Sequence, residues 1–168
     1  MKKLFLILPV VFLLTYACQQ QKKRFFTTSP EIDLVKKAND AYFKGDWETF
    51  KSCYSDTAQV WINTDPAHES PITVDQMIDS FKQGLANMSE YKLGDFYVNE
   101  MTVSDNGGKW VHTWLTWTGK TKDGKDVVFP VNISSNVVDN KIVIAGLIYN
   151  ALPGYLASQP ADSSMMTH

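Results

Sequence analysis

The chain has 168 residues, of which 44% are hydrophobic and 20% charged, a composition typical of one globular domain with short extensions. Sixteen Lys and Arg against eighteen Asp and Glu give a formal net charge of −2, so no basic field is present to hold a phosphate backbone and no nucleic acid partner is expected. From Phe25 onward the chain has eleven lysines, eighteen acidic residues and no arginine, so an anion site there would depend on Lys, His or backbone amides.

The first residues have the pattern of an export signal. A basic start, Met1 to Lys3, precedes an apolar stretch from Leu4 to Leu14 that only Pro9 interrupts. Such a stretch suits a secretory signal peptide and is too short for a membrane span, which needs about 20 apolar residues. It leads into Ala17-Cys18, which resembles the lipobox of bacterial lipoproteins, although Thr15 and Tyr16 depart from the usual residues.

The lipobox resemblance predicts residues 1–17 as a signal peptide and residues 18–29 as a lipid-anchored tether, with Cys18 as the lipidation site. The expected location is the bacterial cell envelope, facing the periplasm or on the outer membrane, with the membrane as a partner through Cys18. An ordinary secreted protein, or one held by an uncleaved signal, is the alternative. Cys53 is the only other cysteine, and its place on an apolar helix side predicts a buried core thiol.

Three helices are predicted in the first half of the domain. The first begins at Ser29, an N-cap followed by a proline, and its apolar residues recur at helical spacing up to Gly45. Asp46 caps a second, short helix. After a strand at 58–63, the third helix begins at a capping box made by Thr73 and the glutamine three residues later, and it carries one continuous apolar stripe.

The sequence of the second half of the domain is typical of β-strands. Segments rich in Val, Ile, Trp and Thr alternate from residue 91 onward and are separated by turn sequences at 105–108, 122–124 and 139–140. Four long strands with tight turns form an antiparallel meander, and the three helices must cover one of its faces. The fold class is therefore α+β, and residues 153–168 are expected to be a C-terminal tail.

This order of elements resembles the nuclear transport factor 2-like superfamily, in its SnoaL-like and ketosteroid-isomerase-like branch, over about residues 31–152. The resemblance implies a domain at 30–152 in which three N-terminal helices pack on a strongly curved antiparallel sheet, as a cone-shaped α+β barrel. It also implies a small-molecule pocket in the cone and a homodimer formed through the outer sheet face, for which Val131, Ile133, Ile144 and Ile148 are the expected contacts.

The catalytic residues of the isomerases are not matched in this chain. The resemblance puts their helix tyrosine at Ala38, their base at Ile62 and their protonated aspartate at Asn132. An alanine and an isoleucine cannot act as acid or base, and an asparagine cannot titrate. Steroid-type isomerisation is therefore not expected, because the general base is missing.

Successive side chains of a strand alternate between its two faces. On the second long strand, the resemblance directs the face with His112 and Trp114 into the pocket. The expected ligand-binding residues are Trp61, Asn63, His112, Trp114, Asn132 and Tyr149. His112 is the best candidate for a base, since an imidazole titrates near neutral pH, although a satisfied interior histidine is the plainer interpretation. The loop from Asp65 to Glu69 contains metal-ligand residue types but is interpreted as solvated, so neither a metal nor a cofactor is expected.

Three functions are compatible with this pattern. The favoured one is a lipid-anchored, non-enzymatic module that binds a neutral or weakly acidic, apolar or aromatic small molecule. The first alternative is a SnoaL-like lyase, isomerase or hydrolase that uses His112 as base, with Tyr149 or Asn132 as its electrophilic partner. The second alternative is a structural or interaction domain whose cavity is filled by its own side chains, which the volume of the cavity would distinguish.

Overall fold

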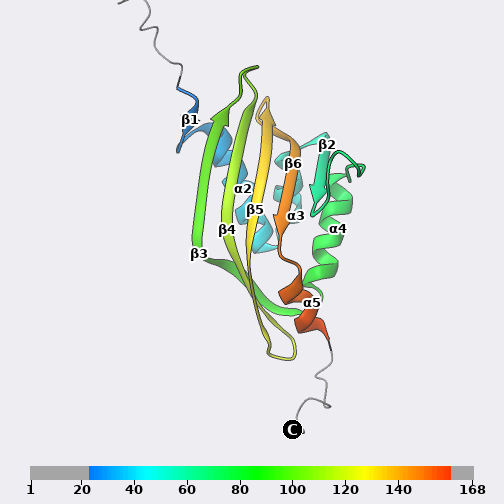
Figure 1. The fold of residues 1–168 in the computed structure, drawn as a ribbon. Helices are drawn as coiled ribbons and strands as arrows, with labels where there is room; N and C mark the ends of the chain where they lie inside the picture. The colour runs from blue at the N-terminus through cyan, green and yellow to red at the C-terminus, as the bar shows by residue number, and fades with distance from the viewer. Residues whose placement is uncertain (1–22, 160–168) are drawn as a thin grey trace, which may run out of the picture.

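A six-stranded sheet curls around the interior of the protein in a computed structural model that describes residues 23–159 (Figure 1). Four long strands form the expected antiparallel meander, and two others extend it at its edges. In spatial order the strands are β1 (Phe25–Phe26), β3 (Met88–Val103), β4 (Lys109–Thr121), β5 (Asp126–Val138), β6 (Lys141–Tyr149) and β2 (Tyr54–Ile62). Among the strand pairs of residues 23–159, β2 and β6 alone are parallel.

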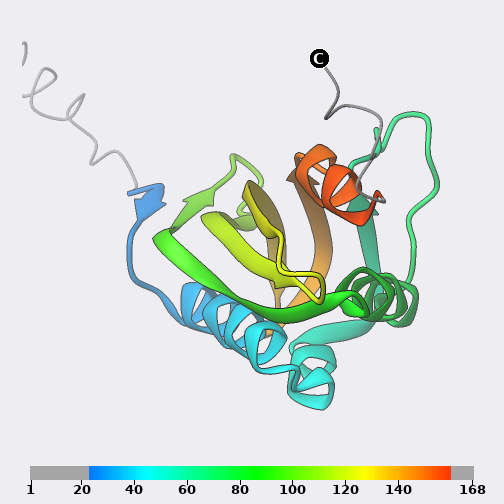
Figure 2. The same cartoon turned by 90° about the horizontal axis from the view of Figure 1, so that it is seen from below.

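Three helices cover the concave side of this sheet, as Figure 2 shows from below: α2 (Pro30–Lys44), α3 (Trp47–Ser52) and α4 (Val74–Leu85). Their starts follow the sequence signals. The Ser29 hydroxyl accepts a hydrogen bond from the Ile32 amide at 3.2 Å, and Thr73 and Gln76 form a complete capping box. The α+β class and the strongly curved sheet under three N-terminal helices are therefore confirmed.

The core lies between these helices and the inner face of the sheet. Helix residues such as Ile32 and Met77 are completely buried against strand residues such as Val111 and Ile142. Cys53, between α3 and β2, is buried in the same cluster as a free thiol. The structure thus confirms the prediction of a core thiol at this position.

Both ends of the described chain contain structure that the sequence did not indicate. Phe25 and Phe26, within the predicted tether, pair with Thr102 and Met101 of β3 as strand β1. A short helix, α5 (Leu152–Ser158), occupies the start of the predicted C-terminal tail. None of the helices in residues 23–159 is long and apolar enough to cross a membrane. The predicted signal peptide and Cys18 lie outside the described residues.

The predicted strand parity in the meander is wrong. On β4, Val111, Thr113 and Leu115 are buried, whereas the Trp114 side chain is 39% exposed. The face with Trp114 is therefore the outer, convex face of the sheet. The same inversion holds on β5, because Val131 and Ile133 line the interior and do not lie on the outer face.

Candidate functional site

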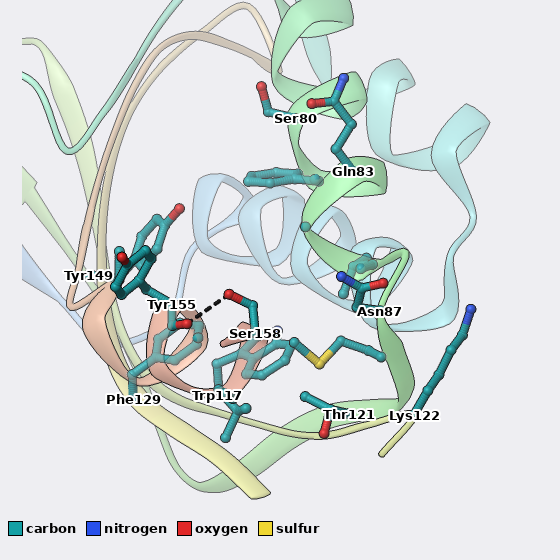
Figure 3. Close-up of a pocket in the computed structure, with 18 of the residues that line it drawn as sticks. Ser80, Gln83, Asn87, Trp117, Thr121, Lys122, Phe129, Tyr149, Tyr155 and Ser158 are labelled. Carbon is teal, nitrogen blue, oxygen red and sulfur yellow. Dashed lines mark hydrogen bonds between the residues drawn. The ribbon is translucent and has the colours of Figure 1, made fainter. Parts of the chain in front are cut away.

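A cavity of about 640 Å³ opens at the end of the cone where α5 lies (Figure 3). Its walls come from Tyr42 of α2, the second half of α4, the start of β3, the inner faces of β4 to β6, the β4–β5 turn and α5. Residues that line it include Tyr42, Phe81, Leu85, Met88, Trp117, Val127, Phe129, Tyr149, Tyr155 and Ser158. The cone is therefore hollow at this end, and α5 forms part of its rim.

A smaller compartment of about 70 Å³ lies deeper in the cone. It shares five aromatic residues with the outer cavity: Tyr42, Phe81, Trp117, Phe129 and Tyr149. Its other lining residues are mostly apolar and include Leu115, Val131, Ile133 and Leu147, together with Asn39 and Tyr54. The larger space is an outer chamber, and the smaller one forms the floor of the cone. The five shared aromatic rings lie between them.

A row of four aromatic rings crosses four neighbouring strands, and three of these rings, those of Trp117, Phe129 and Tyr149, line the cavity. Tyr91 and Trp117 are stacked with ring centroids 6.2 Å apart, Trp117 and Phe129 at 4.9 Å, and Phe129 and Tyr149 at 5.4 Å. The strands of Trp117 and Tyr149 flank that of Phe129 on opposite sides, so both faces of the Phe129 ring are covered. The Phe129 ring therefore presents its edge, which carries partial positive charge, to the cavity.

Tyr42 of α2 connects this row to the helices. The Trp117 indole Nε1–H donates a hydrogen bond to the Tyr42 hydroxyl at 3.1 Å, and the Tyr42 and Phe81 rings meet edge to face at 5.1 Å. Burial raises the pKa of Tyr42 well above its ordinary value, so the phenol stays neutral. Its role is to orient the indole of Trp117.

The Trp117 side chain occupies space that only a glycine leaves open. Gly119 lies two residues further along β4 on the same face, and a Cβ atom there would come 2.4 Å from the Trp117 ring. Side chains two apart on a strand share a face, so the missing side chain of Gly119 allows the indole to lie flat along the strand.

Charge is confined to the rim of the cavity. Of the described residues that line the two chambers, only Lys122 and Asp123 are charged, and both lie in the β4–β5 turn. The Asp123 carboxylate is engaged by Thr121 and by Lys125, whose Nζ lies 3.1 Å away. An ionised ligand would lose its hydration inside this cavity without a counter-charge, so the cavity suits a neutral, largely apolar molecule.

Helix α5 is attached over the opening by the Lys125 side chain and by the packing of Ala157 against the cluster of Leu115, Trp117 and Val127. The Lys125 Nζ donates hydrogen bonds to the carbonyl oxygens of Ala157 at 3.0 Å and Gln159 at 2.8 Å. These carbonyls lie at the C-terminal end of α5, where a cation is favourable and no intrahelical donor remains. Lys125 therefore attaches α5 to the β4–β5 turn across the rim.

Of the predicted site residues, only Tyr149 lines the cavity. His112 and Trp114 lie together on the outer sheet face, where their rings are 6.0 Å apart. The His112 Nδ1 and Nε2 atoms are each 3.1 Å from a hydroxyl oxygen, that of Ser134 and that of Thr102. Asn132 is opposite Trp114 on the neighbouring strand and shares the outer face. The predicted convergence of these three residues with Tyr149 is wrong, because they belong to the other side of the sheet.

Trp61 and Asn63 do not line the cavity either. The Trp61 Nε1–H donates to the carbonyl of Glu69 at 3.1 Å, which holds the following loop against β2. The Asn63 side-chain oxygen accepts from the Tyr149 amide at 2.8 Å and so secures the end of the parallel pair β2–β6. In the same loop, the Asp65 carboxylate contacts the His68 ring at 2.8 Å. No three metal-ligating side chains cluster anywhere in residues 23–159.

The residues that sequence reasoning missed are those of the aromatic row and its helices. The predicted parity, with His112 and Trp114 facing inward, would put Trp117 on the outer face of β4, and the same inversion on β5 would put Phe129 there. Tyr42 is one of the apolar residues at helical spacing in the first predicted helix. The glycine two residues after Trp117 was the available signal, since Gly in a strand often marks a large neighbouring side chain or a close backbone approach. No such signal indicates the contribution of α5.

Solved structures share this fold. IdmH of Streptomyces antibioticus, provisionally assigned as a polyketide cyclase, has a TM-score of 0.60 and 17% identity, over 77% of this chain and 98% of its own. A Xanthomonas campestris protein with the same provisional assignment has 0.58 and 20%, over 73% and 92%. A nuclear transport factor 2-like protein from Burkholderia xenovorans has 0.58 and 13%, over 80% and 100%. At these identities the likeness shows the nuclear transport factor 2-like fold and not the activity.

No protein-family model matches the sequence, and no curated protein matches it.

Proposed function

We propose that this protein binds a small, neutral, apolar or aromatic molecule in the cone, at the surface of the bacterial cell envelope. The observation that carries the proposal is the cavity of about 640 Å³, whose described lining is aromatic and aliphatic inside and charged only at the rim. Small-molecule sites commonly have volumes of about 300–1,000 Å³, mostly apolar walls and a few polar groups.

Two observations favour this proposal over its alternatives. A structural domain with a filled cone would not leave a chamber of this size. The enzyme that uses His112 as base loses its support, because that imidazole lies on the outer sheet face, bonded to Thr102 and Ser134. The solved structures assigned as polyketide cyclases have the same fold, and an enzymatic role here would need a different set of reactive groups.

Native mass spectrometry of the purified protein tests the binding proposal. We expect a neutral organic molecule to be carried through purification, or added 2-acetylnaphthalene, a neutral bicyclic ketone, to bind at one site per chain. Binding can be followed by quenching of tryptophan fluorescence, since Trp117 lines the cavity. A protein that carries no ligand and binds no neutral aromatic probe would contradict the proposal.

We further propose that Cys18 is diacylated and holds the domain at the membrane. The support is in the sequence: an apolar stretch of eleven residues, Leu4 to Leu14, leads into Ala17-Cys18. Two acyl chains on this cysteine would suffice for a stable anchor. Replacement of the cysteine, Cys18→Ala, should move the protein from the membrane fraction to the soluble fraction. Failure of labelled fatty acid to enter the wild-type protein would overturn the proposed anchor while leaving the binding proposal intact.

A further inference from the structure

Tyr54, the first residue of β2, occupies an unusual place at the floor of the cone. Its side chain is only 7% exposed, and its ring packs against Phe50 with centroids 5.1 Å apart. It lines the inner compartment together with Asn39, Leu147 and the shared aromatic rings. A buried residue with a polar group is therefore part of the lining of the inner compartment.

The Tyr54 hydroxyl forms no hydrogen bond with any residue in the described part of the chain, which is rare for a buried polar group. It is not sealed off, since no described side-chain nitrogen or oxygen is both fully buried and unpaired. The compartment that Tyr54 lines is a space within reach of this side chain. The hydroxyl is thus available to a molecule that reaches the floor.

The other phenols near the floor are differently engaged. The Tyr42 hydroxyl accepts from Trp117, and the Tyr97 hydroxyl accepts from the Asn39 amide nitrogen at 3.3 Å. Tyr149 lines the outer chamber as well as the floor and is less deeply buried than Tyr54. Among these phenols, Tyr54 alone combines near-complete burial with a free hydroxyl.

This hydroxyl is a hydrogen-bond donor under all ordinary conditions. Burial raises the pKa of Tyr54 well above its ordinary value, because the phenolate would be desolvated. No residue described in the lining of the inner compartment carries a positive charge. The floor therefore favours a neutral acceptor oxygen over a carboxylate, which would be buried without a counter-ion.

We propose that the Tyr54 hydroxyl donates a hydrogen bond to a neutral oxygen, such as a ketone carbonyl, at the inner end of an otherwise apolar ring compound. This inference rests on the proposed binding function and adds the class and orientation of the ligand. The ring system occupies the outer chamber beside the row from Tyr91 to Tyr149, and the oxygen points to the floor.

Two probes of matched shape test this inference: 2-acetylnaphthalene and 2-isopropylnaphthalene, which replaces the ketone by a hydrocarbon group. Their affinities are measured by tryptophan fluorescence for the wild type, for Tyr54→Phe and for Ser134→Ala, which removes a hydroxyl that contacts His112 on the outer sheet face, away from the cavity. We expect Tyr54→Phe to lower the ketone affinity by about five- to tenfold, the worth of one neutral hydrogen bond, and to leave the hydrocarbon affinity unchanged. Ser134→Ala should retain the wild-type preference for the ketone over the hydrocarbon.

The outcomes are distinguishable. If Tyr54→Phe keeps the wild-type preference for the ketone, the hydroxyl does not contact the ligand, and this inference is wrong although the binding function stands. If the wild type binds neither probe, the binding function itself fails and the inference fails with it. Circular dichroism of Tyr54→Phe checks that the variant is folded, which the loss of one unpaired oxygen should not prevent.

Discussion

Trp117 is the residue through which the cavity wall holds together. Its ring stacks on Phe129 of the neighbouring strand, and its indole N–H donates a hydrogen bond to Tyr42 of α2. The ring also lies over Gly119 of its own strand, so three contacts fix its position. Trp114, three residues earlier on the same strand, lies on the opposite face and is partly exposed. The two tryptophans therefore form a natural pair of test and control.

Replacement of the inner ring, Trp117→Ala, should weaken the binding of 2-acetylnaphthalene by about 1–3 kcal/mol, the rough worth of one buried aromatic side chain. Trp114→Ala should leave the affinity within about 0.5 kcal/mol of the wild-type value, because that ring faces away from the cavity. Isothermal titration calorimetry measures both. Equal losses in the two variants would place the ligand outside the cone.

The sequence predicted the location of some individual residues and not of others. Tyr149 was expected in the pocket and lines it, and Cys53 was expected in the core and is buried there. The sequence does not show whether His112 lies on the outer sheet face or acts as a base in the cavity. In both cases the residues around it alternate in the same way along the strand. The partners Thr102 and Ser134 become visible only when three strands are in register.

Among the elements, the helices were the most predictable because their signals are local. The Thr73 and Gln76 capping box and the Ser29 cap involve residues three apart, and both formed as expected. The strand order of the meander followed from short turns. The inner face of β4 could not be identified in the same way, since both of its faces carry a tryptophan and the alternation is equally consistent with either. The more aliphatic set, with Val111 and Leu115, was the buried one.

Helix α5 was not predictable because it has few helix signals of its own. It lacks a side-chain N-cap, contains a glycine and a proline, and no residue of it is buried. Such a short segment is held by tertiary contacts and not by its propensity. Here the contacts include the hydrogen bonds from Lys125, which comes from a distant turn, and the packing of Ala157 against the inner face of the sheet.

Lys125→Met should therefore loosen α5 and speed the exit of a bound molecule. We expect the dissociation rate of 2-acetylnaphthalene to rise about three- to tenfold, the effect of losing roughly one charge-assisted hydrogen bond at a half-exposed site, with little change in global stability. Stopped-flow fluorescence measures the rate. The matched control is Lys141→Met, which removes a similar bond to the Ser52 carbonyl at 2.5 Å, far from the opening. If both variants release the probe at the wild-type rate, α5 does not gate the cavity.

The outer face of the sheet, on the side away from the cavity, carries exposed apolar side chains. Trp114, Asn132 and Ile148 are in register across three strands, and Ile148 is 66% exposed. Among the described residues in register with positions 110, 112 and 114 on this face, Glu100 alone is charged. We propose that this face pairs with a second copy of the chain, through Trp114, Ile144 and Ile148 and not through the interior Val131 and Ile133.

A charge at the centre of this face should prevent pairing. Ile148→Lys is expected to sediment as a monomer at micromolar concentration, where the wild type sediments as a dimer, because the ammonium would be desolvated against an apolar partner surface. Val138→Lys places the same charge on an exposed residue at the β5–β6 turn and should leave the dimer intact. A wild type that is already monomeric under these conditions would refute the proposed dimer.

The pairing of β1 with β3 also determines at which end of the domain the N-terminal segment enters, relative to the cavity opening. Figure 1 shows β1 and α5 at opposite ends of the long axis, so the chain enters the domain at the end away from the cavity opening. If Cys18 is the anchor, the seven residues from it to Phe25 can span at most about 25 Å. The lipid bilayer would then lie near the β1 end, and the opening would face the aqueous compartment. Ligand would be exchanged with that compartment, or with another protein in it, and not directly with the lipid phase.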